Sequence, residues 1–292
     1  MASILTNTSA MVALQTLKST NKNMAGIQNQ ISTGMKVSSA KDNGAVWAIA
    51  SVMRSDVKGL GTVKEALSLG SATLGVARSA AETVAELLTE AKERILGGGD
   101  LSNADSREKL VADLHAIGSQ IGTIVGSASF NGVNLLDASV TTEIEDADGD
   151  DVPGVAMVSS LARDNTGALT VETIAVAARD LSGIADILLG WDEASLEDAD
   201  AMQTTLDALE AELTTALDAA TAFGTAQKQI DIQSNFVGKF IDSLNSGIGA
   251  MVDADMEEAS ARLQALQVQQ QLGIQALSIA NQNPQNILAL FR

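Results

Sequence analysis

Few residues in this sequence could carry acid–base or nucleophilic chemistry. His115 is the only histidine, and no second nitrogen ligand accompanies it. A zinc-protease motif needs two histidines on one helix face, so that chemistry is excluded. No serine stands in a G-x-S-x-G elbow, the turn that exposes the nucleophile of α/β-hydrolases. We therefore expect no catalytic residue, and we expect a structural role for His115.

Two further stretches look like parts of ligand loops but lack essential residues. The run Asp146–Asp151 begins like a calcium loop, but Asp151 stands where such a loop needs Gly and Met157 where it needs Glu. We interpret the run as a solvated acidic turn, with weak divalent-ion binding as the alternative. Gly97-Gly98-Gly99 is not followed by the Lys-Ser/Thr of a phosphate loop. The sequence therefore predicts no metal site and no cofactor.

The composition favours long packed helices over a globular enzyme. Hydrophobic residues make up 46% of the 292 residues, whereas aromatic residues make up only 2%. Pro153 and Pro284 are the only prolines, so little interrupts helices between them. Cysteine is absent, which excludes a disulfide framework. We expect neither a cleaved secretory signal nor a transmembrane helix, because the apolar stretches are too short or too polar.

Two apolar registers with a seven-residue period predict two long helices. The first helix should begin at the N-cap candidates Asp42 and Asn43 and end at Gly97. The second should begin at about Ser195, where Ser195 and Asp198 have capping-box spacing. Every position of the two registers is apolar: Met53, Leu60, Leu67, Leu74, Ala81, Leu88 and Ile95, and then Met202, Leu209, Ala216, Phe223, Ile230, Val237, Leu244 and Met251. We expect the two helices to pair antiparallel and form a rod.

Shorter elements are expected between these two helices. A helix that restarts near Ser102 or Asp105 should fold back on the first one. Asn131-Gly132 favours a tight turn. One or two small hairpins are expected from three β-prone pieces: Val140–Ile144, Val155–Val158 and Leu169–Val171. The predicted fold class is mainly α, with long antiparallel heptad helices, paired terminal helices and a small β-hairpin outer region.

Both ends of the chain are amphipathic and almost uncharged. No charged residue lies between Arg262 and Arg292, and Met1–Ile31 carries only Lys18 and Lys22. Apolar residues recur at helical spacing in both segments: Leu17, Met24, Ile27 and Ile31, and Leu263, Leu266, Ile274, Leu277 and Ala280. Because a free surface helix normally carries charges opposite its apolar stripe, we interpret both ends as assembly surfaces. The alternative is that each helix docks on its own domain.

The net charge of −19 disfavours nucleic acid as a partner. Acidic residues dominate from Asp137 to Asp218, where only Arg163 and Arg179 oppose them. Such a stretch is most simply a solvated outer face that keeps an assembly soluble. Neither nucleic acid nor a membrane is therefore an expected partner.

Three motifs connect the chain to a known family. Ile31–Asn43 reads ISTGMKVSSAKDN and is followed by Ala48-Ile49-Ala50. The Phe130–Val133 turn reads FNGV, and Ala280–Leu288 reads ANQNPQNIL. With these motifs, in this order, the chain resembles bacterial flagellin, the filament subunit of the flagellum. The resemblance covers both terminal thirds.

The resemblance implies a division of the chain into five parts. These are an N-terminal filament-core helix (1–42), N-terminal rod helices (43–136), a short variable outer region with hairpins (137–190), a C-terminal rod helix (191–254) and a C-terminal filament-core helix (255–292). The self-assembly interface would include Leu17, Met24, Ile27, Ile31, Leu263, Leu266, Ile274 and Leu277. Candidate O-glycosylation sites are Ser159, Ser160, Thr166, Thr170 and Thr173.

The resemblance also implies a function, a location and partners. The chain would be secreted and would polymerise, without enzymatic activity, into the extracellular filament that drives swimming motility. Its partners would be other flagellin subunits, the flagellar type III export apparatus, an export chaperone, and filament cap and hook-junction proteins. Two alternatives remain: a hook–filament junction protein, which would share weaker terminal similarity, and a secreted coiled-coil effector, which would not require uncharged ends.

Overall fold

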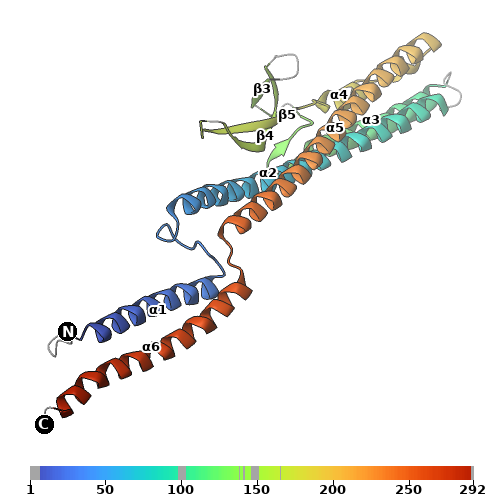
Figure 1. Ribbon diagram of the computed structural model, residues 1–292. Helices are drawn as coiled ribbons and strands as arrows, with labels where there is room; N and C mark the ends of the chain where they lie inside the picture. The colour runs from blue at the N-terminus through green and yellow to red at the C-terminus, as the bar shows by residue number, and fades with distance from the viewer. Residues whose placement is uncertain are drawn as a thin grey trace. The chain divides into compact units, whose positions relative to one another are not determined.

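The computed structural model describes residues 7–97, 103–137, 139–140, 142–145, 151–164 and 166–290, with the backbone alone for 283–290. The chain divides into a terminal unit, Met1–Val57 with Asp242–Arg292, and a middle unit, Lys58–Ile241. Two long helices, α2 (Gly44–Gly97) and α5 (Ala199–Val252), contribute residues to both units (Figure 1). Long paired helices and a small antiparallel β region confirm the predicted fold class.

The terminal unit is built on an antiparallel helix pair, α1 (Thr8–Thr33) and α6 (Met256–Leu290), which lie side by side in Figure 1. The amide of Asn7 donates to the carbonyl oxygen of Ala280 at 2.8 Å, and the amide of Gln270 donates to Asn21 Oδ1 at 2.8 Å. The facing side chains recur every three or four residues: Ala10, Ala13, Leu17, Thr20, Met24, Ile27 and Ile31 on α1, and Ala259, Leu263, Leu266, Gln270, Gly273, Leu277 and Ala280 on α6. The predicted helical spacing is confirmed at Leu17, Met24, Ile27 and Ile31 of α1 and at Leu263, Leu266, Leu277 and Ala280 of α6.

One member of the predicted C-terminal stripe lies at the edge of the packed face of α6. Ile274 is 54% exposed, and Gly273 occupies the facing position beside it. A Cβ built on Gly273 would lie 3.4 Å from Leu17 Cδ1, in van der Waals contact. Ile274 is therefore not buried in the seam with Leu277, and the seven-residue period of the packed positions passes through Gly273 instead.

A short backbone joint closes the other end of this pair. Gly34 ends α1 with a φ of 70°, a left-handed conformation that glycine adopts readily. The N–H groups of Lys36 and Val37 donate to the carbonyl oxygen of Val252 at 2.7 and 3.3 Å, and the N–H of Ala254 donates to the Gly34 carbonyl at 2.9 Å. These bonds tie the segment after α1 to the segment before α6.

The N-cap of α2 is Asn43, whose Oδ1 accepts the N–H of Val46 at 3.2 Å. Asp42, also proposed from sequence, has a different role. Its Oδ2 accepts from the backbone N–H and the hydroxyl of both Ser38 and Ser39, at 3.0 to 3.2 Å. The carboxylate therefore organises the loop before α2 and leaves capping to its neighbour.

In the middle unit, α2 and α5 pair antiparallel along their apolar registers. Lys92 Nζ lies 3.1 Å from Glu210 Oε2, and the Ser71 hydroxyl donates to Asp231 Oδ1 at 3.2 Å. Of the predicted register residues in this unit, Met202 is half-buried and all others are 1% exposed or less: Leu60, Leu67, Leu74, Ala81, Leu88, Ile95, Leu209, Ala216, Phe223, Ile230 and Val237. The two predicted registers are confirmed as the core of this unit.

Helix α3 (Ala104–Ser127) folds back along α2, as predicted, and Arg94 of α2 reaches Asp113 of α3 at 2.9 Å. Its N-cap is Asn103, whose side chain accepts the N–H of Asp105, and it begins at Ala104, between the two predicted starting points. A short helix, α4 (Ser182–Leu189), was not predicted. It packs closely on α3, where a Cβ on Gly118 would lie 3.0 Å from Leu188 Cβ.

The start of α5 also differs from the prediction. A 3-10 turn, η1 (Glu193–Leu196), comes first, and its capping box joins Asp192 to Ser195. Asp198 then accepts the N–H of Ala201 at 2.8 Å, and α5 begins at Ala199. The predicted pair of Ser195 and Asp198 therefore caps two successive elements, because each polar side chain finds its own free N–H within three residues.

The β region consists of two small antiparallel sheets. Strands β1 (Ser129–Phe130) and β2 (Val133–Asn134) flank the predicted tight turn, whose Asn131 and Gly132 have φ values of 51° and 81°. Such values fit a type I′ turn. Strands β3 (Glu143–Glu145), β4 (Asp151–Arg163) and β5 (Leu169–Ala177) form the second sheet in that order. Val155–Val158 and Leu169–Val171 are confirmed as parts of the longer strands β4 and β5, whereas only Glu143 and Ile144 of the described residues in Val140–Ile144 lie in a strand.

Candidate functional site: outward faces of the helices

The single histidine makes a structural contact. His115 Nε2 lies 2.8 Å from the backbone carbonyl oxygen of Trp191. Because a carbonyl only accepts, the ring N–H points at that oxygen and ties α3 to the segment after α4. No grouping of three or more His, Cys, Asp or Glu side chains suited to a metal occurs among the described residues. The acidic run Asp146–Asp151 lies outside the described residues except for Asp151.

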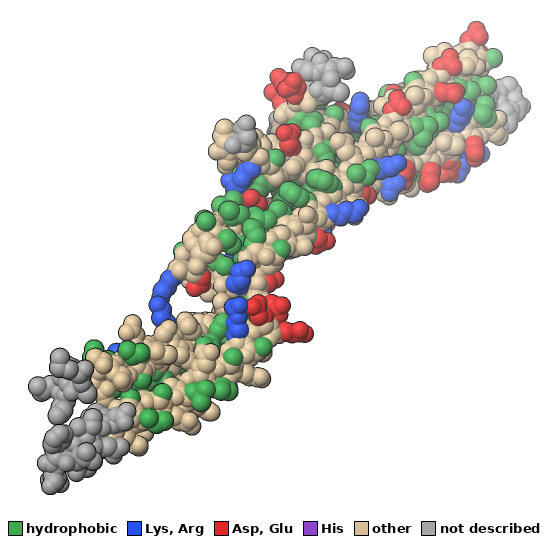
Figure 2. Space-filling view, in the orientation of Figure 1, with side chains coloured by type: hydrophobic (Ala, Val, Ile, Leu, Met, Phe, Trp, Pro, Cys, Tyr) green, Lys and Arg blue, Asp and Glu red, His purple; other side chains and the backbone are tan. Residues whose placement is uncertain are grey.

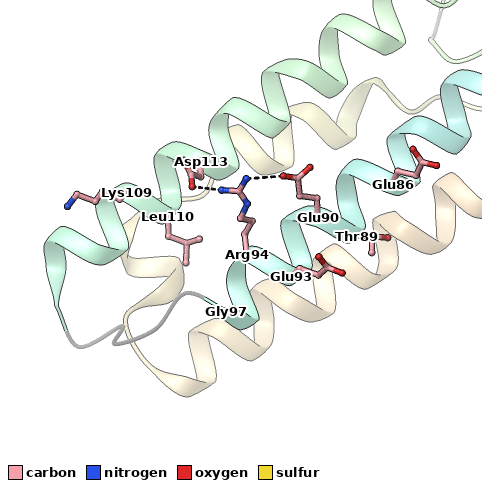
Figure 3. A pocket seen from close by; sticks show the side chains of 9 residues that line it. All are labelled: Glu86, Thr89, Glu90, Glu93, Arg94, Gly97, Lys109, Leu110 and Asp113. Atoms are coloured by element: carbon pink, nitrogen blue, oxygen red, sulfur yellow. Dashed lines mark hydrogen bonds and ion pairs between the residues drawn. The ribbon is translucent and has the colours of Figure 1, made fainter.

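A groove of the middle unit lies between α2 and α3 and has a volume of about 770 Å³. Figure 3 shows Arg94 reaching from α2 toward Asp113 of α3 and Glu90 of its own helix, at 2.9 Å from each. The hydrogen bond that Arg94 donates to Glu90, and then the charge of Asp113, raise the pKa of Arg94. These side chains are about half exposed, so the ion pairs contribute little stability. Glu86, Glu93 and Lys109 complete an open, charged lining that brings no reactive pair together.

The residues predicted to form the self-assembly interface fall on two different faces. Seven of the eight are half-buried between α1 and α6 of the same chain: Leu17, Met24, Ile27, Ile31, Leu263, Leu266 and Leu277. Ile274 alone is exposed. The structure thus brings most of them together as an intrachain seam and leaves a separate outward face.

That outward face is rich in apolar side chains, and the exposed Lys18 and Lys22 are the only charged residues of α1. Large exposed hydrophobic side chains lie on both terminal helices: Met11, Val12 and Leu14 on α1, and Val268, Leu272, Ile274 and Ile279 on α6. Glutamines 264, 267, 269, 271 and 275 are exposed between them. Figure 2 shows mostly hydrophobic and uncharged side chains over the terminal helices, with charged side chains gathered where α6 begins. Exposed apolar surface of this extent marks an interaction surface.

A groove of about 510 Å³ runs between α1 and α6. Ile27, Leu266 and Ala265 contribute apolar surface, and Lys22 and Arg262 add positive charge. Gly26 also lines it, and a Cβ built there would meet no atom within 4 Å. The groove is therefore open where a helix of another molecule could approach.

The middle unit carries a second exposed apolar stripe on α5. Ile232, Phe236 and Phe240 recur every four residues, and the two phenylalanines, 56% and 40% exposed, stack with ring centroids 6.1 Å apart. The sequence analysis did not predict this stripe, because its three residues lie outside the seven-residue register that was used to identify the helix. The available signal was a phenylalanine pair off the register in a chain with only five phenylalanines.

The five candidate O-glycosylation hydroxyls are not equally accessible. Ser159 is only 6% exposed and Ser160 is half-buried. Thr166, Thr170 and Thr173 are exposed on β5 and the turn before it. The Thr166 hydroxyl donates to Asp164 Oδ1 at 2.6 Å, and this bond lowers the pKa of that carboxyl group.

Among the described residues, no helix combines the length and apolar character needed to cross a membrane. Long paired helices with exposed apolar side chains on their outer faces are typical of a protein that associates with other protein surfaces. Residues 4–141 match the family model for the bacterial flagellin N-terminal helical region, and residues 206–291 match that for the C-terminal helical region. The chain belongs to the bacterial flagellin family.

Individual relatives agree along the whole chain. It is 40% identical over 295 residues to a flagellin of Brucella melitensis, covering 100% of both chains. It is 39% identical to flagellin FljK of Caulobacter vibrioides, covering 99% of this chain and 98% of the relative. A solved flagellar hook-associated protein from Vibrio parahaemolyticus shares the fold alone, at 14% identity with a TM-score of 0.55, covering 73% of this chain and 100% of that one.

Family membership confirms several predictions from sequence. The chain is the non-enzymatic subunit of the flagellar filament, it serves motility, and it resides in the extracellular filament. It polymerises with copies of itself. The full-length match to flagellins favours the filament subunit over the junction protein and the coiled-coil effector.

Proposed function

We propose that the five parts of the chain have separate roles in the filament. The terminal segments 1–42 and 255–292 form the filament core, 43–136 and 191–254 form the rod around it, and 137–190 forms a short outer region. The observation that carries this proposal is the contrast between the apolar, almost uncharged outward face of α1 and α6 and the charged surface of the middle unit. A helix face with so few charges suits burial among copies of itself.

The predicted interface residues would then act in two ways. The seven seam residues, Leu17, Met24, Ile27, Ile31, Leu263, Leu266 and Leu277, align α1 with α6 inside one subunit. Ile274 and its outward neighbours contact the next subunit, and the groove beside Gly26 receives a helix of a neighbouring copy. A repeated head-to-tail contact that does not close into a ring generates a helical polymer.

The experiment that tests this assignment is seeded polymerisation followed by electron microscopy. The full chain should extend short filament seeds into long tubes, and a chain lacking Leu263–Arg292 should stay soluble. A second pair of variants separates the two faces: Ile274→Asp should block growth, whereas Gln264→Asp controls for added charge on the same helix. Equal growth of all four proteins would refute the assignment of the core.

Outside the polymer, we propose four partners: the flagellar type III export apparatus, an export chaperone, and the filament cap and hook-junction proteins. The support is the exposed apolar row on α6, Val268, Leu272 and Ile279, which needs cover before assembly. Affinity purification of the chain from its secreting host should recover a small chaperone, and Val268→Ser with Leu272→Ser should lose it. Retention of the chaperone by that variant would place its site elsewhere.

For modification, we propose O-linked sugars on the outer region, with Thr166, Thr170 and Thr173 as the favoured acceptors over Ser159 and Ser160. The support is exposure, since a glycosyltransferase needs a hydroxyl that it can reach. Intact-mass measurement of native filaments, followed by peptide mapping, tests this proposal. A mass equal to that of the bare chain would end it.

A further inference from the structure

The backbone joint of the terminal unit is lined by methionine. Its buried core is Val37, Ala50, Ile248 and Val252, and the half-buried side chains around it include Met35, Met53 and Met251. Three of the nine methionines of the chain are thus gathered on one small cluster. We propose that this cluster is an oxidation-sensitive site, where hydrogen peroxide converts the three thioethers to sulfoxides and loosens the joint.

The chemistry is a two-electron oxygen transfer. A sulfur lone pair attacks one peroxide oxygen, the O–O bond breaks and an S–O bond forms. The departing hydroxide takes the proton of the transferred oxygen and leaves as water, so the sulfur is oxidised and the peroxide reduced. The product is a polar, chiral sulfoxide, which methionine sulfoxide reductases can return to the thioether.

A sulfoxide oxygen on these methionines would disturb contacts that hold the joint together. Met35 Sδ lies 3.6 Å from Arg54 Nη2, a cation that can donate to a sulfoxide oxygen and pull Met35 toward it. Met53 packs on α5, where a Cβ on Gly247 would lie 3.3 Å from its terminal methyl. An oxygen on Met53 would enter this apolar contact and lose water without an equivalent replacement.

The cluster is coupled directly to the bonds that close the joint. Met251 precedes Val252, whose carbonyl oxygen accepts the N–H groups of both Lys36 and Val37. Met35 itself pairs with Asp253 in the isolated β-bridge between the two segments. Because methionine fills irregular cores through its flexibility, its oxidation removes packing on both sides of this bridge at once.

The terminal unit also contains matched reference methionines. Met11 and Met256 are 65% and 43% exposed and lie outside the cluster. They are open to peroxide, so their conversion measures the dose. Their oxidation should not loosen the joint, which gives a control within the same molecule.

The test uses unassembled subunits, in which Met11 and Met256 are exposed as in the single chain, and treats them with hydrogen peroxide. Peptide mass spectrometry maps the sulfoxides, and hydrogen exchange follows the Lys36 and Ala254 amides, which bond across the joint. Oxidation should speed exchange at these amides by at least about tenfold through local opening, in the wild type and in the Met11→Leu/Met256→Leu control. The Met35→Leu/Met53→Leu/Met251→Leu variant should keep slow exchange, since leucine conserves volume.

Two results would overturn the proposal. One is that Met35, Met53 and Met251 stay reduced while Met11 and Met256 are converted. The other is equal acceleration of exchange in the triple variant and the wild type. If the triple variant does not fold, Met53→Leu alone replaces it, and exchange at the joint should then be slowed only in part. Because unassembled subunits are treated, the result does not depend on the assignment of the filament core.

Discussion

Gly273 of α6 faces Leu17 of α1 so closely that a Cβ on the glycine would lie 3.4 Å from Leu17 Cδ1. The two helices therefore meet where one of them has no side chain. Gly273→Leu should force them apart and destabilise the pair by about 1–3 kcal/mol, the usual range for overpacking. Urea unfolding followed by circular dichroism measures this loss. Gly26→Leu is the matched control, because a Cβ at Gly26 meets no atom within 4 Å, and equal losses would contradict the packing.

The same Gly26→Leu variant makes a second prediction. Its side chain would project into the groove between α1 and α6 without disturbing the chain's own fold. If the groove receives a neighbouring copy, seeded filament growth should slow by about tenfold or more, since overpacking at an interface costs of the order of 1–3 kcal/mol. Gly26→Ala should grow faster than Gly26→Leu. Unimpaired growth of Gly26→Leu would show that the groove stays empty in the filament.

The exposed stripe on α5 should also take part in assembly. Phe236→Ser with Phe240→Ser should raise the critical concentration for polymerisation, by about tenfold for each 1.4 kcal/mol of interface energy lost. The thermal midpoint of the unassembled subunit should hardly change, because both rings are exposed. Sedimentation of polymer measures the concentration. Leu217→Ser, at another exposed position of α5, is the control and should assemble more readily than the double variant.

Phe223, a core residue of the same helix, should affect the stability of the subunit instead of its assembly. Phe223 is 0% exposed and belongs to the packed register of α5. Phe223→Ala should destabilise the middle unit by about 3–5 kcal/mol, through lost burial and the cavity left behind. Calorimetry should show a lower melting temperature for Phe223→Ala than for Phe236→Ala. A loss below about 1 kcal/mol would mean that the α2–α5 seam is not closely packed.

The loop before α2 should respond to acid through Asp42. Hydrogen bonds from Ser39, and then from Ser38, lower the pKa of this carboxyl group from 3.8. The stabilising effect of a depressed carboxyl pKa is present above the unfolded value and is lost as pH falls through the folded value. Nuclear magnetic resonance titration should give an Asp42 pKa below 3.8, and Ser38→Ala with Ser39→Ala should raise it. An unchanged pKa in that variant would contradict the contacts.

The heptad core could be predicted from sequence because burial repeats with the helix itself. Leu67 and Ile230 lie where a seven-residue period puts them, and both are 0% exposed. The tight turn at Asn131-Gly132 could also be predicted, since this kind of turn depends on two adjacent residues. Such features are local or strictly periodic, so one sequence suffices to find them.

Other features depend on which residues meet across long distances in the chain. Ile274 has the right spacing to join the seam, but Gly273 occupies the position opposite Leu17. Helix α4 is only eight residues long and is stabilised by its packing on α3. It is too short to show a recognisable repeat of apolar residues in the sequence. The phenylalanine stripe was missed because it lies on the face that the core does not use.

The hydrogen bond between Asn7 and Ala280 joins residues 273 positions apart. Contacts of such high sequence separation form late, because closing so long a loop costs entropy before any packing repays it. The α1–α6 pair therefore cannot form until almost the whole chain is present in one place. A molecule delivered from its first residue onward would have no partner for α1 until the end arrives, so its topology itself delays completion of the fold.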